Sequence, residues 1–468
     1  MKVLTKKEWI FVFTPSIERH FHKFYKRESG FIYFSILKET LLFFIKPLVT
    51  KYDFLNLDGS TKIDFLFFAT ENNHLDQQEP LFRELTKRGN SVYFLDCISK
   101  LSIRIKGITE KAISPEPLNR GLGLLAKLKT YVFYYSIAKE ISRDLSIPKS
   151  VCLRILLSFS SLGIQFEHLV TAFFSKVTIN KGVVLGYDIP LIGRMLATIA
   201  KKYGYKVSCP MHGTLSSMYK DFGSAADNLF LFGEQDFQTL RDWNLDVKLE
   251  VTGSAALDKV ILGSIEPVFG SRLEVPNQKK LVLVAGSGPG DSVSLDGHLQ
   301  FITELMEIAA EYQHDFYFVF KLHIKDNKSY YHKIIKGLSN LLVVSSEEAN
   351  TISTNIFEWL KGVDILITGA STVGLEAQLQ GIPCVSFDPK EELGSKFYIA
   401  KGDTLYCTKK DQVELLLAKF LKGEALLEAN RVKEIERKYF YKADGKSAIR
   451  MADFLERNTN LVCVVSPE

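Results

Sequence analysis

The sequence predicts an α/β fold in which two lobes, each built on a parallel sheet, face a central cleft and helices close the chain. Short apolar runs alternate with helical patterns twice along the chain, and a stretch rich in glycine and proline separates the two series. Strands that alternate with helices form parallel sheets covered on both faces. The length of 468 residues exceeds one ordinary hydrophobic core, so two lobes are expected.

The first lobe is predicted over residues 61–263, after a basic, aromatic and helical segment over residues 1–60. Its strands are expected at Lys62–Ala69, Ser91–Asp96, Gly182–Tyr187, Lys206–Pro210, Leu229–Phe232 and Lys248–Val251. A polar loop follows the first strand over residues 70–78, and helices are expected at Pro80–Arg88, Leu191–Tyr203 and Gln235–Trp243. A helical insert covers residues 122–174.

A linker is predicted over residues 264–278, which contain Pro267, Gly270 and Pro276, and the second lobe over residues 279–423. Its strands are expected at Leu281–Ala285, Phe316–Leu322 and Leu341–Val344, and a strand, turn, helix and strand lie within Asp364–Asp388. Helices are expected at residues 299–312, 330–338, 356–361 and 412–421. The C-terminal helices of residues 424–468 are expected to pack back on the first lobe.

Composition narrows the classes of function. A net charge of +5 on this length does not indicate a nucleic-acid-binding protein, which shows dense basic clusters. The six cysteines form no CxxC pair, so neither zinc nor a disulfide framework is expected, and the chain is predicted to be reduced and cytoplasmic. No HExxH, GxSxG or P-loop motif occurs. The most apolar stretch, residues 151–174, carries Arg154, Glu167 and His168, which disfavours a membrane span.

Basic and aromatic side chains alternate over the first fifty residues, including Lys23, Lys26, Arg27, Phe31 and Phe34. Such a segment is able to lie on an anionic membrane surface, which would make the protein peripheral on the inner membrane. The alternative is that the aromatic residues pack on the first lobe and the lysines face water.

The turn after Ile365–Thr368 carries Ser371 and Thr372, and the helix that follows carries Glu376. Free N–H groups at a helix start favour an anion. A carboxylate further along the helix is able to accept hydrogen bonds from a ribose. The segment therefore predicts a nucleotide site. The alternative is that the small residues serve close packing and Glu376 is a solvated side chain.

Two more clusters follow strands of the second lobe. Ser287 and Gly288 belong to a glycine-rich turn, where the backbone is able to approach a phosphate or sugar closely, although a flexible connection is the alternative. Lys321 and His323 lie two residues apart at the end of a strand, so both side chains point to the same side. They offer cationic donors to a diphosphate.

His212 follows a strand of the first lobe and precedes Gly213, which suits a general base at a strand end. The alternative is a histidine that bonds nearby backbone and supports the turn. Asn72, Asn73 and His74, in the polar loop after the first strand, are candidate contacts for an acceptor substrate.

These motifs together resemble the GT-B class of nucleotide-sugar-dependent glycosyltransferases. Among them the chain is most similar to bacterial surface-polysaccharide enzymes, which include capsule transferases and CDP-glycerol glycerophosphotransferases. The resemblance spans residues 206–455 and rests on the order of Met211-His212-Gly213, Val251–Asp258, Lys321-Leu322-His323, Ser371-Thr372, Glu376-Ala377, Gly381-Ile382-Pro383 and Asp444–Ala448. Ile324 and Ala255 depart from the glycerophosphotransferase pattern, which has proline at both positions.

The resemblance implies two Rossmann-like lobes facing a central cleft, with the acceptor in the first lobe and the donor in the second. It implies that His212 is the base or an acceptor-site residue, that Lys321, His323, Ser371 and Thr372 hold the donor phosphates, and that Glu376 binds the ribose. The expected function is a metal-independent glycosyltransferase that uses a nucleotide-activated sugar as substrate, needs no cofactor, and acts on a glycan or lipid-linked acceptor in surface polysaccharide synthesis. Lobe closure would exclude water.

Three alternatives remain open at this point: a glycerophosphotransferase, a non-hydrolysing sugar-nucleotide 2-epimerase of the same fold, and a catalytically silent nucleotide-binding scaffold. The epimerase would need acidic residues near the sugar in both lobes, and the sequence places no such pair.

Overall fold

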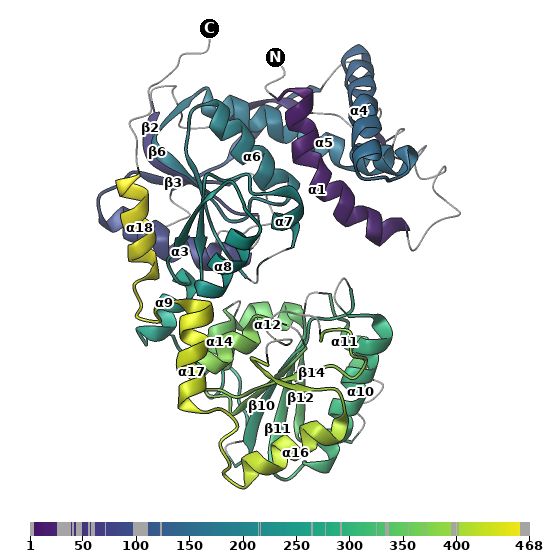
Figure 1. Cartoon of the computed structure of the whole chain (residues 1–468), viewed down its shortest axis with the longest axis vertical. Coiled ribbons are helices and arrows are strands. Elements are labelled where there is room, and N and C mark those ends of the chain that lie inside the picture. The colour runs from purple at the N-terminus through teal and green to yellow at the C-terminus, as the bar shows by residue number, and fades with distance from the viewer. Residues whose placement is uncertain are drawn as a thin grey trace. The chain divides into compact units, whose positions relative to one another are not determined.

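The computed structural model describes residues 4–25, 39, 42–43, 49–54, 57, 61–70, 72–96, 111–121, 124–213, 215, 217–263, 265–276, 278–290, 293–323, 325–332, 337–353, 355–369, 371–394, 399 and 402–458. The chain divides into two compact units. Unit 1 comprises residues 1–258 and 446–468, and unit 2 comprises residues 259–445. Each unit is an α/β body with a parallel sheet and helices around it (Figure 1), which confirms the predicted fold class.

The sheet of unit 1 has seven strands, and all its pairs are parallel. In spatial order they are β4 (Ala112–Ile113), β3 (Val92–Leu95), β2 (Thr61–Phe68), β6 (Val177–Leu185), β7 (Val207–Pro210), β8 (Asn228–Leu231) and β9 (Lys248–Val251). Counted along the chain this order is 3-2-1-4-5-6-7. The strand order reverses between β2 and β6, and the carboxyl ends of strands beside such a reversal are where doubly wound sheets bind ligands.

Helices cover both faces of this sheet. They are α3 (Asn72–Lys87), α4 (Leu124–Asp144), α5 (Lys149–Phe174), α6 (Leu191–Lys202), α7 (Met218–Phe222), α8 (Glu234–Asp242) and α9 (Ala255–Ile261), which runs into unit 2. Because successive side chains of a strand point to opposite faces, Phe65 and Phe67 of β2 pack with α3, whereas Leu66 and Phe68 pack in the core with α5 and α6. A separate antiparallel pair joins β1 (Val49–Phe54) to β5 (Pro115–Gly121).

The N-terminal helix α1 (Lys6–Tyr25) packs against α4, α5 and α6. Trp9 and Phe13 of α1 stack with ring centroids 5.1 Å apart, and both meet Tyr134 of α4 edge to face. These aromatic residues are buried, so the early part of the basic, aromatic segment packs on unit 1. Lys26, Arg27, Phe31 and Phe34 lie outside the described residues.

The sheet of unit 2 has six parallel strands in the order 3-2-1-4-5-6. They are β12 (Leu341–Val344), β11 (Phe316–Lys321), β10 (Lys280–Ala285), β13 (Ile365–Thr368), β14 (Cys384–Phe387) and β15 (Leu405–Cys407). The helices of this unit are α10 (Leu295–Glu311), α11 (Lys328–His332), α12 (Ser346–Ile352), α13 (Ile356–Leu360), α14 (Val373–Leu379), α16 (Lys410–Leu421) and α17 (Ala429–Ile435), which continues as a π-helical turn, η2 (Glu436–Phe440).

The boundary between the units differs from the predicted linker. Residues 265–276 belong to unit 2, where Val268 and Phe269 are buried and Phe269 meets Trp359 edge to face. Burial of these apolar side chains, which the local proline and glycine pattern does not reveal, makes the segment part of the core. The chain instead passes between the units after Asp258 and again after Gly445.

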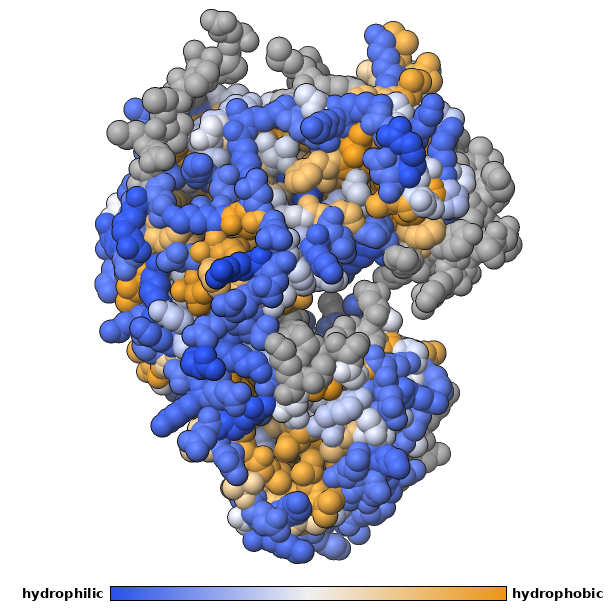
Figure 2. Space-filling view, in the orientation of Figure 1, coloured by the Kyte–Doolittle hydropathy of each residue, from blue (hydrophilic) through white to orange (hydrophobic). Residues whose placement is uncertain are grey.

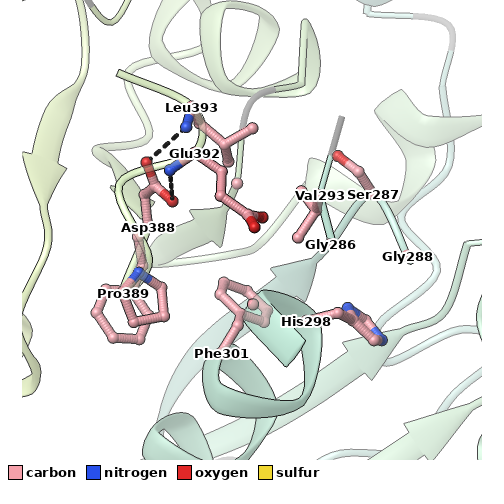
Figure 3. Close-up of a pocket in the computed structure, with 13 residues that line it drawn as sticks. Gly286, Ser287, Gly288, Val293, His298, Phe301, Asp388, Pro389, Glu392 and Leu393 are labelled. Atoms are coloured by element: carbon pink, nitrogen blue, oxygen red, sulfur yellow. Dashed lines mark hydrogen bonds between the residues drawn. The ribbon is translucent and has the colours of Figure 1, made fainter. Parts of the chain in front are cut away.

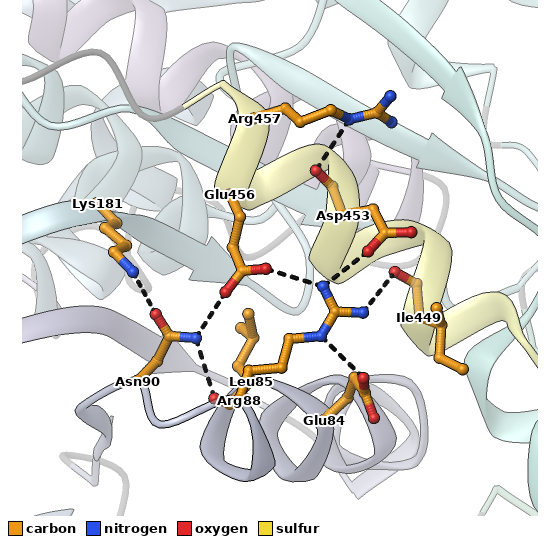
Figure 4. Close-up of polar contacts among 9 residues, drawn as sticks. All are labelled: Glu84, Leu85, Arg88, Asn90, Lys181, Ile449, Asp453, Glu456 and Arg457. Atoms are coloured by element: carbon orange, nitrogen blue, oxygen red, sulfur yellow. Dashed lines mark hydrogen bonds and ion pairs between the residues drawn. The ribbon is translucent and has the colours of Figure 1, made fainter.

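The last helix, α18 (Ser447–Arg457), belongs to unit 1, whereas α17 belongs to unit 2. The carboxylate of Asp258 accepts hydrogen bonds from the Ser447 and Ala448 N–H groups at 3.0 and 2.8 Å, so it caps the start of α18. Arg88, at the end of α3, donates to Asp453 and Glu456 of α18 at 2.7 and 2.8 Å (Figure 4). These contacts join α18, which follows unit 2 in the sequence, to α3 and α9, which precede it.

Among the described residues, no single helix reaches the length and apolar composition of a membrane span. The two halves of α5, Lys149–Phe159 and Leu162–Phe174, reach them only together, across a bend of 46°.

Candidate functional site

Three neighbouring strands of unit 2 end in the residues predicted to hold a nucleotide. β10 lies between β11 and β13, so the turn with Ser287 and Gly288 lies between the segments that follow those two strands. β11 leads to Lys321 and His323, and β13 leads to Ser371 and Thr372. The strands are parallel and in register, with Ala285 opposite Thr368 and Val284 opposite Phe320. All these segments therefore emerge at one edge of the sheet, where its strand order reverses.

The turn after β10 packs closely on the segment after β11. Gly288 has a φ of 65°, and a Cβ atom built on it would lie 3.1 Å from the backbone nitrogen of Asp326. A side chain at this position would both strain the backbone and crowd the neighbouring loop. Glycine is thus required here for the close approach of two loops, in addition to any access that it gives a ligand.

A pocket opens at this edge between β10, β13 and β14 (Figure 3). Ser287 and Gly288 line it, together with Gly286, Val293, Gly297, His298, Phe301, Gly369, Phe387, Asp388, Pro389, Glu392 and Leu393. Lys321, His323, Ser371, Thr372 and Glu376 are not among the lining residues. The structure therefore places two of the predicted donor residues in the pocket. Lys321, His323, Ser371 and Thr372 lie at or just after neighbouring strand ends, and Glu376 lies in α14.

Sequence reasoning missed the acidic side of this pocket. The carboxylate of Glu392 points into it (Figure 3) and accepts a hydrogen bond from the Ser294 N–H at 2.8 Å, at the start of α10. Asp388 follows β14, and its carboxylate accepts from the N–H groups of Glu392 and Leu393 at 3.0 and 2.7 Å. Asp388 directly follows the predicted strand that ends at Phe387, and this position could have marked it as a site residue. No local pattern marks Glu392.

Lys321 is a cation without an acidic partner among the described residues. Its ammonium lies 5.6 Å from the ring centroid of Trp359, and it makes no hydrogen bond or ion pair with any residue that the structure describes. Burial lowers the pKa of Lys321 because the charged form loses water. A partly desolvated ammonium with no carboxylate partner gains most from an anionic ligand.

His323 lies in a positive environment. Partial burial and the nearby charges of Lys325 and Lys321 lower its pKa, while Asp326 acts in the opposite direction. Its Nδ1 atom accepts a hydrogen bond from the Lys325 N–H at 3.2 Å, so in this tautomer Nε2 carries the proton and is a donor. An anion next to Lys321 would raise the pKa of His323 and strengthen that donor.

The predicted turn and helix after β13 are present. Thr372 lies at the start of α14 and makes no capping hydrogen bond with its side chain, and Ser371 Oγ accepts from the Val373 N–H at 3.4 Å. Ser371, Thr372 and Glu376 are each half-buried. The small residues also serve packing, since Gly374 faces Cys384 of β14.

In unit 1, two histidines meet at the edge where the sheet reverses. His212 follows β7, and His74 lies in the first turn of α3, which follows β2. Their rings meet edge to face with centroids 4.4 Å apart, and the ring of Tyr187, which follows β6, lies 4.5 Å from that of His212. The structure thus joins the predicted base to one of the three predicted acceptor residues.

Residues 72–78 are helical, and not the loop that was predicted. Gln78 donates hydrogen bonds to the carbonyl oxygens of Phe68 and Val184 at 3.1 Å, so a polar side chain ties α3 to the ends of β2 and β6. Of the polar residues that indicated a loop, Gln78 and His74 are 0% and 1% exposed, whereas Asp76 is exposed. Asn72 and Asn73 lie in the same first turn, and their side chains are outside the described part of the chain.

Burial controls the charge of both histidines. It lowers the pKa of His212 to about 4, against the opposing influence of Asp188 and of a hydrogen bond to the Gly186 backbone. Burial and the neighbouring His212 also lower the pKa of His74 well below its usual value. Both rings are therefore neutral near pH 7.

Asp188 is the acidic group behind this pair. Its buried carboxylate accepts hydrogen bonds from the hydroxyls of Tyr219 and Ser224 at 2.7 and 2.6 Å and from the N–H groups of Ala225 and Ala226 at 2.7 and 3.1 Å. These four donors hold a negative charge in place, and that charge favours a proton on His212. Within the described ranges, no group of three or more His, Cys, Asp or Glu side chains is arranged to hold a metal ion.

No family model matches the chain, and no curated protein matches it in sequence. Solved structures share its fold. UDP-GlcNAc 2-epimerase from Neisseria meningitidis bound to UDP-GlcNAc matches with a TM-score of 0.53 at 13% identity, over 85% of this chain and 100% of that one. MnaA of S. aureus with UDP gives 0.51 at 13%, over 86% and 98%. The wall teichoic acid polymerase TagF gives 0.51 at 13%, over 94% and 98%.

These neighbours are enzymes of the two-lobed GT-B class, and the chain has the GT-B fold. At 13% identity the likeness defines the fold alone, so the chemistry of this chain has to be argued from its own residues.

Proposed function

We propose that the protein is a metal-independent glycosyltransferase that moves a sugar from a nucleotide-activated donor to a glycan or lipid-linked acceptor in surface polysaccharide synthesis. One observation carries this proposal. Three adjacent strand ends of unit 2 bring Ser287 and Gly288, Lys321 and His323, and Ser371 and Thr372 to one edge, and Lys321 lacks an acidic partner among the described residues. Such an edge suits a nucleoside diphosphate.

The donor is held by unit 2 in this proposal. As the bond from the sugar to the phosphate oxygen breaks, the electron pair leaves with the nucleotide, and negative charge grows on that oxygen. The Lys321 ammonium and the His323 N–H stabilise this charge, together with the hydroxyls of Ser371 and Thr372. Positioned cations take the role that a divalent ion has in other transferases. Glu376 accepts hydrogen bonds from the ribose.

The acceptor hydroxyl loses its proton to His212. A neutral imidazole with one free nitrogen is able to take that proton while the hydroxyl oxygen bonds to the anomeric carbon. The imidazolium that forms is stabilised by the nearby charge of Asp188. His212 serves equally as the base in a transfer of glycerophosphate, so this residue alone does not select the donor.

A 2-epimerase is the second candidate, because the structure from Neisseria meningitidis that shares the fold is a UDP-GlcNAc 2-epimerase. It would act on a nucleotide sugar without an acceptor. Glycerophosphotransferase activity is the third, and a silent scaffold that binds nucleotide without turnover is the fourth. The four candidates differ in the substrates that they consume. A glycosyltransferase consumes a nucleotide sugar and an acceptor, an epimerase acts on the nucleotide sugar alone, a glycerophosphotransferase consumes CDP-glycerol, and a scaffold consumes no substrate.

A two-stage experiment separates these functions. A thermal-shift panel of UDP-, CMP-, CDP- and GDP-linked sugars and CDP-glycerol identifies the donor, and Lys321→Ala serves as the matched variant. The donor is then incubated with and without glycan and lipid-linked acceptors, and nucleotide release and epimerised sugar are measured. Acceptor-dependent release of nucleotide is expected. Epimerisation without an acceptor, or binding with no turnover under any condition, would contradict the transferase proposal.

We further propose that α4 is the part of unit 1 that contacts a membrane carrying the acceptor. Four large apolar side chains on one side of α4 are exposed: Leu125 (67%), Leu128 (50%), Val132 (60%) and Tyr135 (40%). The spacing 125, 128, 132 and 135 follows one face of a helix. Lys129 and Lys139 are exposed on the same helix, and the Lys149 ammonium lies 4.2 Å from the ring centroid of Tyr135.

An apolar row flanked by lysines suits an anionic lipid surface. Figure 2 shows hydrophobic residues beside hydrophilic ones in the upper part of the molecule, where α4 lies in Figure 1. Sedimentation with phosphatidylglycerol vesicles tests this surface. Val132→Glu is expected to abolish binding, and Leu415→Glu, at an exposed apolar position of unit 2, is the control. Equal sedimentation of both variants and of the unaltered protein would reject α4 as the contact.

A further inference from the structure

His74 was a candidate acceptor contact from the sequence, but the proposed mechanism gives it no step. His74 is 1% exposed, and its Nε2 atom is buried without a hydrogen-bond partner among the described residues. Its Nδ1 atom accepts from the Thr70 N–H at 3.3 Å, so the ring proton of the neutral form belongs on Nε2. A buried donor left without a partner costs stability, and a position that retains one calls for an explanation.

The ring of His74 fits its place only because residue 186 is glycine. A Cβ atom at Gly186 would lie 2.5 Å from the Cβ of His74, which is far inside van der Waals contact. The Gly186 N–H donates to the Phe68 carbonyl at 2.8 Å, so the strand end itself is held by β2 and does not yield. The same backbone also makes the hydrogen bond to His212 that favours its protonated form, which means that the ring N–H of His212 donates to the Gly186 carbonyl.

His212 is thus enclosed by groups from two parts of unit 1. His74 comes from α3, and Tyr187 and Asp188 come from the loop between β6 and α6. Among the residues that the structure describes, Asp188 is the acidic side chain that acts on His212, and it favours the proton; Tyr187 contributes a ring face. His74 contributes bulk at a ring contact and, being neutral, no charge.

We propose that His74 is a positioning residue for His212. Its ring closes the space behind His212, keeps water away from it and holds it against the Gly186 carbonyl. One nitrogen of His212 is then committed to that carbonyl, and the other stays free for the proton of the acceptor hydroxyl. The part of this inference that concerns catalysis rests on the proposed transferase function, whereas the part that concerns titration does not.

The expected direction of the pH effect follows from burial. A base works in its deprotonated form, and a lowered pKa keeps His212 deprotonated as the pH falls from 8 to about 5. If the His74 ring is removed, water reaches His212 and stabilises its charged form. The pKa of His212 then rises toward its usual range, and the acid limb of kcat/KM moves to higher pH with it.

Nuclear magnetic resonance of the full chain labelled at histidine Cε1 measures this directly. Three variants are compared with the unaltered protein: His74→Ala, His74→Phe and, as control, His20→Gln, which changes a histidine of α1 that contacts Phe159. In the unaltered protein the His212 signal is expected not to titrate between pH 8 and 5.5. His74→Ala is expected to raise its midpoint by about 1–2 pH units. His74→Phe keeps a ring in place and is expected to restore the unaltered behaviour.

The pH dependence of kcat/KM is measured on the same proteins once the donor is known. The acid limb is expected to move in His74→Ala only, while nucleotide affinity stays constant in all variants. An unchanged His212 midpoint in His74→Ala would overturn the inference. So would a His74→Phe protein that behaves like His74→Ala, because His74 would then act through its nitrogen atoms. If His74→Ala does not fold, Gly186→Ala replaces it, since its Cβ displaces the same ring.

If the titration behaves as expected but no acceptor-dependent turnover is found with any donor, the transferase function fails and the positioning role of His74 stands. If acceptor-dependent turnover is found but the His212 midpoint does not move in His74→Ala, the positioning role is rejected and the transferase function stands.

Discussion

The sheets of the two units share the strand order 3-2-1-4-5-6, to which unit 1 adds a seventh strand, and they carry different side chains at the point where that order reverses. In unit 1 the strands beside the reversal lead to His74, Tyr187 and His212, whose rings touch one another. In unit 2 the strand ends at and beside the reversal carry glycines, hydroxyls and the Lys321 ammonium. In the proposed mechanism, the edge of unit 1 takes up a proton and the edge of unit 2 binds an anion.

Burial shifts pKa values at both edges. Its effect on the charge of each group depends on the hydrogen-bond and charge partners that surround the group. Burial turns the histidines of unit 1 into neutral rings, and the buried charge of Asp188 is already satisfied by four donors. In unit 2 burial lowers the pKa of Lys321, and no described carboxylate compensates it. A doubly wound sheet therefore supplies the place for a ligand, and the partners of its buried ionisable groups determine which ligand suits it.

The strongest test of this contrast is to remove the base and leave the anion site intact. His212→Ala is expected to reduce turnover by a factor of about 10²–10⁴ and to leave nucleotide affinity unchanged, because proton transfer and donor binding use different units. Steady-state kinetics and calorimetry on one preparation measure both, with His314→Ala at an exposed position as control. Near-normal turnover would reject the catalytic role, and joint loss of folding and binding would assign His212 to structure.

The converse change removes the two proposed phosphate ligands at the end of β11. Lys321→Ala and His323→Ala are each expected to weaken nucleotide binding by about 1–3 kcal/mol, the usual cost of losing a hydrogen bond to a charged group. Isothermal titration measures the affinity. Lys422→Ala, an exposed lysine of the same unit, is the control. If both variants bind as tightly as the unaltered protein, these residues do not belong to the donor site.

A smaller effect is expected at Glu376, which is half-buried and makes other polar contacts in the protein. Glu376→Gln is expected to weaken binding of a nucleotide by about 1 kcal/mol and to have little effect on the melting temperature, since one hydrogen bond to the ribose loses its charge. Binding of the corresponding 2′,3′-dideoxynucleotide is expected to be equal in both proteins. Full turnover with unchanged affinity would show that Glu376 is an ordinary helix residue.

No effect is expected from chelation. Turnover measured in EDTA is predicted to match turnover in buffer alone, because cations of the chain stabilise the leaving group in the proposed mechanism. Complete loss that magnesium or manganese restores would contradict that mechanism and would require acidic ligands near the pocket, where Asp388 and Glu392 are the first to examine.

Much of the fold was predictable because strands and helices have different periods and short apolar runs mark buried parallel strands. Strands β2, β7, β10, β11 and β13 lie within a residue or two of their predicted limits. Two errors share a cause. Residues 72–78 were predicted to form a loop because they are polar, but they are helical, and His74 and Gln78 are buried. Residues 265–276 were predicted to be a linker because of their prolines and glycine, but they belong to unit 2, where Val268 and Phe269 are buried. In both cases long-range partners outweighed local composition.

The sequence by itself determined which residues stand at strand ends, because the alternation of strands and helices marks those ends. His212, Lys321, His323, Ser371 and Thr372 were found in that way. Only the tertiary structure decided which of them have neighbours and what those neighbours do. The contact of His74 with His212, the place that Gly186 leaves for it, and the entry of Glu392 into the pocket all join segments distant along the chain. Charge state and ligand preference depend on burial and partners, and these arise only when distant segments are packed together.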